Sequence, residues 1–277
     1  MQPKEIFPLD PLRLLKKPYC SGLLTGECVK GFEHLDINSI PFDELAHKGI
    51  DQPFNLLKST KSRCTVSFEF TTNGLTRVVY VKRYKVLRPL RRIGYLFVPS
   101  KSTREWKLGY SLIKRGIHTP LPVVRAEFKK GPFVIENYLV TLGIEPYQPV
   151  PDYLVQLENG EERNSFLASI ALFVRSVHQA GFYHDDLGAH HIFCLPGQKG
   201  EMHFALIDLD NGRLLRSVPY RCRVKNLFQI FRSLDESSLS KEERMRFLKN
   251  YLEAAPSPSL LSRINALALR KTGRQVI

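Results

Sequence analysis

Alternating apolar and polar residues predict a group of strands in the first half of the chain. The alternation runs over 54–57, 64–70 and 76–84. Polar segments at 58–62 and 72–74, the second ending in glycine, separate these runs and are typical of turns. Short strands joined by short turns predict an antiparallel meander.

The chain before residue 50 shows little periodicity. Its clearest signal is a short helical pattern at 41–47. We therefore expect residues 1–50 to form an N-terminal arm that is ordered in part at best. After the meander, a basic connector at 88–99 leads into a helical pattern over 102–115, where a capping-box sequence predicts the helix start.

A strand is predicted at 133–138, and most of the later pattern is helical. Residues 164–180 carry apolar residues at helical spacing and end at a glycine, which predicts a long helix. Helices are also predicted at 225–234 and at 240–253, the second from a capping box. The second half of the chain is therefore expected to be mainly helical.

Composition and charge indicate a globular protein with an anionic partner. The formal net charge is +14, and fourteen Lys or Arg residues lie between 81 and 130 against only Glu105 and Glu127. Nucleic acid, anionic lipid headgroups and a phosphorylated glycolipid would each satisfy such a field, and a solvated basic surface is the plain alternative. Nucleic acid is disfavoured because no reader motif or aromatic interleaving accompanies the basic residues.

The apolar runs are too short to cross a bilayer, which takes about 20 residues, and no leader-like segment starts the chain. The five cysteines are scattered and lack paired spacing, so neither a disulfide framework nor a zinc site is predicted. We expect a soluble, unexported protein of the reducing cytoplasm.

The candidate chemistry centres on residues 183–213, where two acidic clusters each follow an apolar run. Phosphoryl transfer needs one carboxylate to accept a hydroxyl proton and another to hold magnesium, and Asp186 and Asp208 match those places in kinase-like folds. His191 stands where such folds place a metal-binding asparagine. Each cluster taken alone could equally be a turn or a helix cap.

Two residues in the first half of the chain support this interpretation. Lys82 lies within the third predicted strand, where a lysine is ordinarily the solvent-facing part of an alternating pattern. Glu105 stands at the third helical position, where a capping role would suffice. In kinases, however, a strand lysine pairs with a helix glutamate and contacts the nucleotide phosphates. The order of these residues, followed by Asp186 and Asp208, favours a kinase.

Three stretches resemble the lipopolysaccharide core kinases of the Kdo/WaaP family, particularly the heptose kinase branch. They are STREW at 102–106 running on to Gly116, the block from YHDDL to IDLD at 183–210, and VPYRCRVKNL at 218–227 with the later RFLKNYL at 246–252. The resemblance implies an α+β, bilobal, protein-kinase-like fold. We expect a 1–50 arm, an antiparallel β N-lobe with one helix at 51–138, and a mainly helical C-lobe at 139–277.

The resemblance also implies an ATP- and Mg²⁺-dependent transferase that phosphorylates a heptose or Kdo hydroxyl of the lipopolysaccharide inner core. Such an enzyme would work on a glycolipid at the cytoplasmic face of the inner membrane, attracted there by anionic headgroups. The roles implied are the base for Asp186; metal binding for Asp208 and His191; nucleotide binding for Lys82, Glu105, Lys58, Ser59 and Thr60; and substrate-anion binding for Arg221 and Arg223.

Three departures keep other functions open. The loop at 58–62 has no glycine, Asp185 replaces the arginine of the usual catalytic loop, and imidazole at His191 is a poor magnesium ligand. The alternatives are a small-molecule or protein kinase of related fold, and a non-catalytic pseudokinase that binds nucleotide or lipid. Retention of Lys82, Asp186 and Asp208 together favours an active enzyme.

Overall fold

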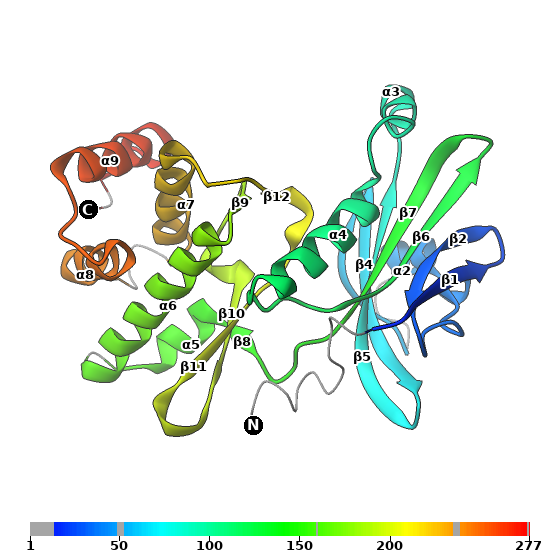
Figure 1. Ribbon diagram of the computed structural model, residues 1–277, viewed down its shortest axis with the longest axis horizontal. Helices are drawn as coiled ribbons and strands as arrows, with labels where there is room; N and C mark the ends of the chain where they lie inside the picture. The colour runs from blue at the N-terminus through cyan, green and yellow to red at the C-terminus, as the bar shows by residue number, and fades with distance from the viewer. Residues whose placement is uncertain (1–13, 49–52, 159, 235–238, 276) are drawn as a thin grey trace. The chain divides into compact units, whose positions relative to one another are not determined.

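The computed structural model describes residues 14–48, 53–158, 160–234, 239–275 and 277. The chain divides into two compact units. One contains the described residues up to Ser111 together with Pro120–Ile144, and the other contains Leu112–Thr119 and the described residues from Glu145 onward. Each unit is considered on its own (Figure 1).

The first unit is built on a seven-stranded antiparallel sheet with the order β1-β2-β6-β7-β5-β4-β3. The predicted meander is present as β3, β4 and β5, three consecutive strands of the chain that form one end of the sheet, and the mixed α/β character predicted from the sequence is confirmed. The strands are β1 (Lys16–Ser21), β2 (Leu24–Val29), β3 (Asn55–Thr60), β4 (Arg63–Thr72), β5 (Leu75–Lys85), β6 (Pro122–Lys130) and β7 (Phe133–Leu142).

Within the described residues 14–48, the first two strands correct the expectation of a partly ordered arm, whose residues 1–13 and 49–50 lie outside the described part of the chain. β1 pairs with β2, and β2 pairs with β6. In β1, Tyr19 is the one buried residue, and its hydroxyl donates to the carbonyl of Leu35 at 2.6 Å. Because β1 lies at the sheet edge and exposes most of its side chains, it leaves no alternating pattern in the sequence. A turn η1 (Ile37–Ser39) and the predicted helix, α2 (Phe42–Lys48), follow.

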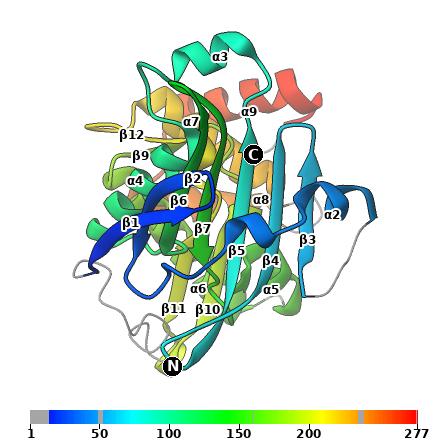
Figure 2. The same cartoon turned by 90° about the vertical axis from the view of Figure 1, so that its right-hand side faces the viewer.

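Two helices cover opposite faces of this sheet, α2 on one and α4 (Lys101–Lys114) on the other (Figure 2). The capping box predicted at the start of α4 is wrong. The hydroxyl of Ser100 accepts from the amide of Thr103 at 3.4 Å, while the Ser102 amide donates to the side chain of Asn137. This shift frees Glu105 from capping. A short helix, α3 (Pro89–Gly94), occupies the basic connector.

Two strands extend further than the sequence pattern suggested. β3 continues to Thr60, so only residues 61 and 62 turn the chain into β4. β7 continues to Leu142, because its last five residues are buried and continue the ladder with β5. The lobe boundary expected after residue 138 therefore differs from the division of the units after Ile144.

The second unit is mainly helical, with a core around α6. Its short sheets have the orders β11-β10-β8 and β12-β9. The helices are α5 (Val150–Gln156), α6 (Glu161–Gln179), α7 (Tyr220–Ser233), α8 (Lys241–Leu252) and α9 (Pro258–Thr272). The strands and turns are β8 (Gln148–Pro149), β9 (Phe182–His184), η2 (Ala189–His191), β10 (Ile192–Pro196), η3 (Gln198–Gly200), β11 (Met202–Leu206), η4 (Leu209–Asn211) and β12 (Gly212–Leu214).

Local sequence explains how the second unit positions its loops. α6 buries Phe166, Ile170 and Val174 along one face and is followed by Gly181 at φ 78°, which turns the chain into β9. The predicted capping box of α8 is present at Ser240. No helix among the described residues combines the length and apolar character needed to cross a membrane.

Candidate active site

In the first unit, Lys82 and Glu105 form a buried ion pair. The Lys82 Nζ atom lies 3.0 Å from Glu105 Oε2, and the two side chains are 14% and 3% exposed. The Tyr84 hydroxyl donates to the other carboxylate oxygen. Lys82 and Tyr84 are two residues apart on β5, so both face α4. The pairing expected from the sequence is therefore present, and the capping role for Glu105 is not.

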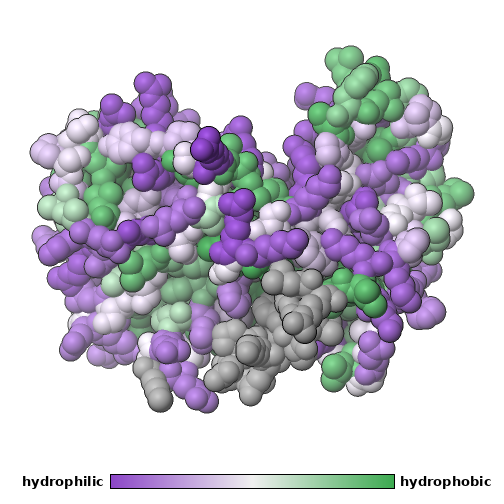
Figure 3. All heavy atoms as spheres, in the orientation of Figure 1, coloured by the Kyte–Doolittle hydropathy of each residue, from purple (hydrophilic) through white to green (hydrophobic). Residues whose placement is uncertain are grey.

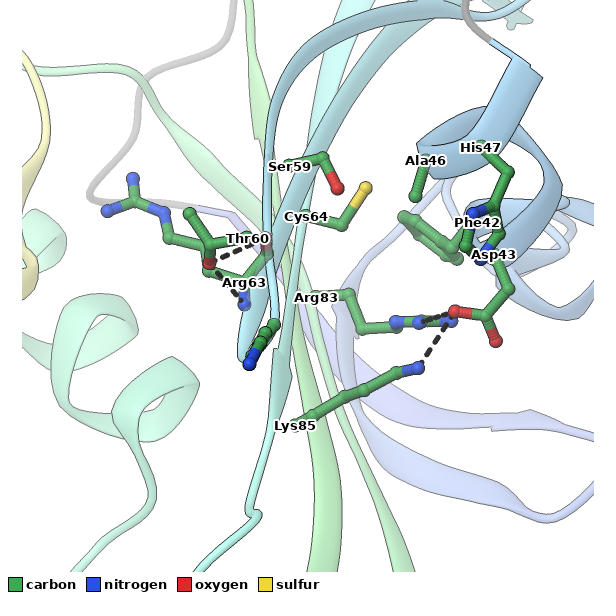
Figure 4. A pocket seen from close by; sticks show the side chains of 11 residues that line it. Phe42, Asp43, Ala46, His47, Ser59, Thr60, Arg63, Cys64, Arg83 and Lys85 are labelled. Carbon is green, nitrogen blue, oxygen red and sulfur yellow. Dashed lines mark hydrogen bonds and ion pairs between the residues drawn. The ribbon is translucent and has the colours of Figure 1, made fainter.

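The next residue on β5, Arg83, points to the opposite face. Its guanidinium and the ammonium of Lys85 both contact Asp43 on α2 (Figure 4). These charged side chains line a cavity of about 280 Å³. Hydrogen bonding to Arg83 and then Lys85 lowers the pKa of Asp43 to about 2. Because side chains alternate along β5, Lys82 and Glu105 form a charged cluster on one face of the sheet, and Arg83, Lys85 and Asp43 form a second cluster on the other.

The same alternation sorts the three candidate phosphate-contacting residues on β3. Lys58 pairs across β4 with Thr65, which in turn pairs with Lys82, so Lys58 shares a face with that lysine. Thr60 lies on this face as well, and its hydroxyl closes the turn by bonding the backbone of Arg63. The side chain of Ser59 points to the opposite, α2 side of the strand, where both Ser59 and Thr60 line the cavity (Figure 4).

In the second unit, Asp186 stands in the loop after β9 with its side chain 57% exposed. Its Oδ1 atom accepts from the side-chain amide of Gln229 at 3.2 Å and lies 3.7 Å from the guanidinium of Arg232. Its backbone amide donates to His184 Nδ1, and its carbonyl accepts from Gly188. The carboxylate is thus accessible while the backbone that carries it is held on both sides.

Three polar residues of α7 hold this loop by its backbone. Asn226 donates to the carbonyl of His184 at 2.7 Å and to Gln229 Oε1 at 2.8 Å. Gln229 donates to the carbonyl of Asp185 at 2.7 Å and accepts from Leu187 at 3.3 Å. The Ser233 hydroxyl accepts from the amide of Ala189 at 2.6 Å. Spaced three and four residues apart, these side chains share one helical face.

A buried histidine connects this network to α8. His178 Nε2 lies 3.2 Å from Asn226 Oδ1, and Nδ1 lies 2.8 Å from the Tyr251 hydroxyl. Burial lowers the pKa of His178 to about 4, so the ring is neutral at pH 7. Because Asn226 uses its amide group as a donor, its oxygen accepts, which places the His178 proton on Nε2. Each group then donates to the next: Tyr251 to His178, His178 to Asn226, Asn226 to Gln229, and Gln229 to Asp186.

His191 is held next to the same loop. Its Nδ1 atom lies 3.0 Å from the carbonyl of Asp186, and burial with help from His190 and His184 lowers its pKa to about 4. A neutral ring that donates from Nδ1 leaves a lone pair on Nε2. The backbone of His191 also accepts from the amide of Ile207, which ties η2 to the segment before Asp208.

Asp208 follows β11 in a left-handed conformation, with φ 56° and ψ 72°. Non-glycine residues seldom adopt this region, and they cluster at ligand-binding and catalytic positions. A carboxylate suits Mg²⁺, whereas the nearby imidazole of His191 does not. Among the described residues there is no group of three or more His, Cys, Asp or Glu side chains that could hold a metal.

Asp185 replaces the usual loop arginine and is itself ion-paired. Its carboxylate lies 2.9 Å from the guanidinium of Arg213 on β12 and 3.6 Å from the ammonium of Lys225. Burial would raise the pKa of Asp185, but the Tyr183 hydroxyl and these two cations together lower it. Asp185 therefore gives this position a negative charge where an arginine would give a positive one, and its ion pairs still anchor the loop.

The two arginines expected to bind substrate anions differ in position. Arg221 is exposed. Arg223 lines a cavity of about 550 Å³ together with Arg175, Arg216 and Tyr251. The buried Nε atom of Arg223 has no hydrogen-bond partner among the described residues. The structure thus assigns the two arginines different surroundings, and Arg223 is the one in a basic cavity.

Sequence reasoning missed the positioning residues Gln229, Ser233 and His178. For Gln229 and Ser233 the only sign in the sequence was their spacing, which continues the helical face begun by Asn226. Polar residues at such positions are ordinarily taken for a solvated face. Here Asn226 and Gln229 are buried, which only the packing of α7 against the loop reveals.

Comparisons with known proteins point to one family. The sequence matches the lipopolysaccharide kinase (Kdo/WaaP) family over residues 51–251. It is 28% identical over 171 residues to the lipopolysaccharide core heptose(I) kinase WaaP of Escherichia coli, covering 59% of this chain and 64% of that protein. It is 25% identical to WaaP of Pseudomonas aeruginosa, covering 53% and 58%.

The chain spans less than two thirds of the length of these curated relatives. A solved structure of WaaP in complex with acyl carrier protein is similar in fold, with a TM-score of 0.61 and 18% identity over 87% of this chain and 96% of that one. The family match covers most of the chain and includes Lys82, Asp186 and Asp208. The chain therefore belongs to the lipopolysaccharide kinase (Kdo/WaaP) family.

Proposed function

We propose that the protein transfers the γ-phosphoryl group of ATP directly to a heptose or Kdo hydroxyl of the lipopolysaccharide inner core. The observation that carries this proposal is the buried pair of Lys82 and Glu105. A strand lysine oriented by a helix glutamate is the arrangement with which kinases contact nucleotide phosphates. A scaffold that bound no nucleotide would gain little from burying these two charges.

Asp186 is the residue we assign to the acceptor hydroxyl. Its exposed carboxylate can accept a hydrogen bond from a sugar, and Gln229 fixes its direction. Withdrawal of the hydroxyl proton then accompanies attack on the phosphorus, with no covalent enzyme intermediate. The guanidinium of Arg232 lies 3.7 Å from Oδ1 of this carboxylate.

Asp208 is assigned to magnesium, with His191 as a weaker candidate through Nε2. A magnesium ion held there would offset the negative charge of the phosphates. On the other unit, Lys58 and Thr60 are the β3 residues we assign to the phosphates. The Ser59 hydroxyl is removed from this set because it points to the opposite face of the sheet.

We assign Arg223 rather than Arg221 to an anionic group of the substrate. Three arginines, Arg175, Arg216 and Arg223, line one cavity, and guanidinium groups bind phosphate and carboxylate in pairs of hydrogen bonds. The positive charge of Arg175 is already balanced by an ion pair with Glu253. The phosphate and carboxylate groups of the inner core could then bind to Arg216 and Arg223.

The test of the proposal is transfer of labelled γ-phosphate from ATP to dephosphorylated lipopolysaccharide core in the presence of magnesium. We expect label in the core glycolipid and none in parallel reactions with an aminoglycoside or a protein acceptor. Transfer to one of those acceptors instead would point to a related kinase of different specificity. Nucleotide binding without any transfer would favour the pseudokinase alternative.

Lys82 is expected to be needed for both stability and catalysis. Replacing Lys82 by methionine leaves the buried Glu105 carboxylate without its cation, which should lower the free energy of unfolding by about 3 kcal/mol. In the double variant Lys82→Met/Glu105→Gln, most of that stability should return because the second change removes the charge. Urea unfolding measures both.

Phosphoryl transfer should remain low in both variants, since neither carries the ammonium that contacts phosphate. Affinity for the core glycolipid should change little. A double variant that regained activity along with stability would show that the pair serves only folding. Equal loss of catalysis and glycolipid binding would place Lys82 on the substrate surface.

Gln229 is expected to act as a positioning residue. In Gln229→Ala, Asp186 loses its side-chain anchor and the loop loses two backbone hydrogen bonds. By analogy with other residues that orient catalytic groups, kcat should fall about 10- to 100-fold, with KM for ATP nearly unchanged. The control is Gln156→Ala, which removes an exposed hydrogen bond on α5. Equal kcat in both variants would exclude the positioning role.

A further inference from the structure

The connector around α3 exposes an unusual amount of apolar surface. Within residues 87–98, hereafter the α3 ridge, six large apolar side chains are exposed, including Leu90 and Phe97 at 83% each. The others are Leu87, Ile93, Leu96 and Val98. Figure 3 shows this apolar surface gathered over α3. Contiguous exposed apolar patches of this kind mark interaction surfaces.

The charge of the sequence segment that carries the α3 ridge has a single sign. Between residues 85 and 104 the sequence contains six Lys or Arg residues and no Asp or Glu. The next two acidic residues in the sequence already have partners. Glu105 pairs with Lys82, and Glu127 accepts a hydrogen bond from Ser100 and pairs with Lys129. Arg88 and Arg91 are exposed, and neither forms an ion pair with a carboxylate in the described part of the chain.

The ridge is an ordered element of the first unit. α3 starts with a proline at its first position, which favours the helix. The Arg92 Nε atom donates to the carbonyl of Val86 at 2.9 Å, and the Val86 amide donates to Ile135 on β7. α3 also contacts β7, whose first residue, Phe133, is exposed and follows an exposed Lys130. These bonds hold the apolar side chains outward.

An anionic bilayer is the occupant that this chemistry fits. Apolar side chains of an amphipathic segment bury about 5–10 Å into the boundary between headgroups and acyl chains. Arginines beside them can extend toward lipid phosphates, which attract cations within a Debye length of about 8 Å. Because residues 85–104 contain no Asp or Glu, this segment has no carboxylate that would be repelled by anionic lipid headgroups.

We propose that the α3 ridge inserts into the surface of an anionic lipid bilayer and holds the protein on the membrane. The inference assigns a membrane-contacting segment that the phosphotransfer chemistry does not use. It bears on the proposed function only through the acceptor, since a glycolipid acceptor is itself embedded in a bilayer. Lipid binding needs neither nucleotide nor acceptor, so the two proposals can fail separately.

The test is flotation of the protein with vesicles of phosphatidylethanolamine and phosphatidylglycerol, compared with phosphatidylcholine alone. We expect binding to the anionic vesicles. Leu90→Ser/Phe97→Ser should lower the partition coefficient by about tenfold or more, because two large apolar contacts are removed. The matched control, Leu75→Ser/Val155→Ser, changes two side chains that are 55% and 75% exposed elsewhere, and should bind as the wild type does.

A charge variant separates the two components of binding. Arg88→Gln/Arg91→Gln should reduce the preference for anionic vesicles, and 1 M salt should remove the difference from the wild type, because salt screens exposed charges. The apolar contribution should persist in that salt. Equal binding by the ridge variant and its control, or wild-type protein that stays unbound, would overturn the proposal.

Phosphoryl transfer to a deacylated, water-soluble core oligosaccharide completes the test. The ridge variant Leu90→Ser/Phe97→Ser should retain wild-type activity there while losing activity on core glycolipid presented in vesicles. If the variant instead changed the oligomeric state in sedimentation and left vesicle binding intact, the ridge would be a contact between protein chains and the lipid proposal would fail.

Discussion

Replacing Asp186 by asparagine is expected to lower kcat for phosphoryl transfer by about 10²- to 10⁴-fold, the contribution of a positioned proton acceptor. The substitution keeps the size of the side chain and its hydrogen bond to Gln229, but it removes the group that can take the hydroxyl proton. KM for ATP should change little, because Asp186 is assigned to the acceptor. Initial rates with saturating core glycolipid measure the effect.

The control for this prediction is Asp152→Asn, which neutralises an exposed carboxylate in the first turn of α5. Circular dichroism and urea unfolding should show both variants folded, since the side chain of Asp186 is itself 57% exposed. An Asp186→Asn enzyme as active as the Asp152→Asn control would refute the assignment of the base.

The second large effect is expected for Asp208→Asn. An amide oxygen carries no charge to offset that of magnesium, so the metal should bind more weakly and kcat should fall about 10²- to 10³-fold at millimolar magnesium. Raising the magnesium concentration should restore part of the activity. The left-handed backbone at residue 208 tolerates asparagine, which keeps the fold unchanged.

A titration of rate against magnesium concentration tests this prediction. The midpoint should shift upward in Asp208→Asn and stay in place in Glu201→Gln, which neutralises an exposed carboxylate just before β11. An Asp208→Ala enzyme that remained active and fully magnesium-dependent would remove Asp208 from the metal site. His191→Ala should then be tried as the alternative ligand.

Much of the candidate site could be predicted because its residues stand in short, ordered motifs. Lys82 belongs to a strand with clear alternation, and Asp186 and Asp208 each follow an apolar run. Glu105 left two interpretations open, since the same position suits a helix cap. The packing of α4 decided between them, because the helix begins at Lys101 and its Glu105 points to β5.

Other features carried no local signal. β1 exposes all but one of its side chains fully or in part, so its membership in the sheet depends on pairing with β2 and not on periodicity. Ser59 and Lys58 are neighbours in the sequence and were grouped together, but strand alternation sends them to opposite faces. The turn at 61–62 is shorter than the polar run suggested, since polar residues also suit an exposed edge strand such as β3.

The sequence by itself determined the α+β class, the meander of β3 to β5, and the order of Lys82, Glu105, Asp186 and Asp208, because periodicity and motif spacing are local properties of the chain. Only the tertiary structure decided how those residues are held. A chain of hydrogen bonds runs from Tyr251 on α8 through His178 on α6, and through Asn226 and Gln229 on α7, to the exposed carboxylate of Asp186. These segments are far apart in sequence, and the burial of His178, Asn226 and Gln229 makes an unsatisfied polar group there costly enough to fix their partners.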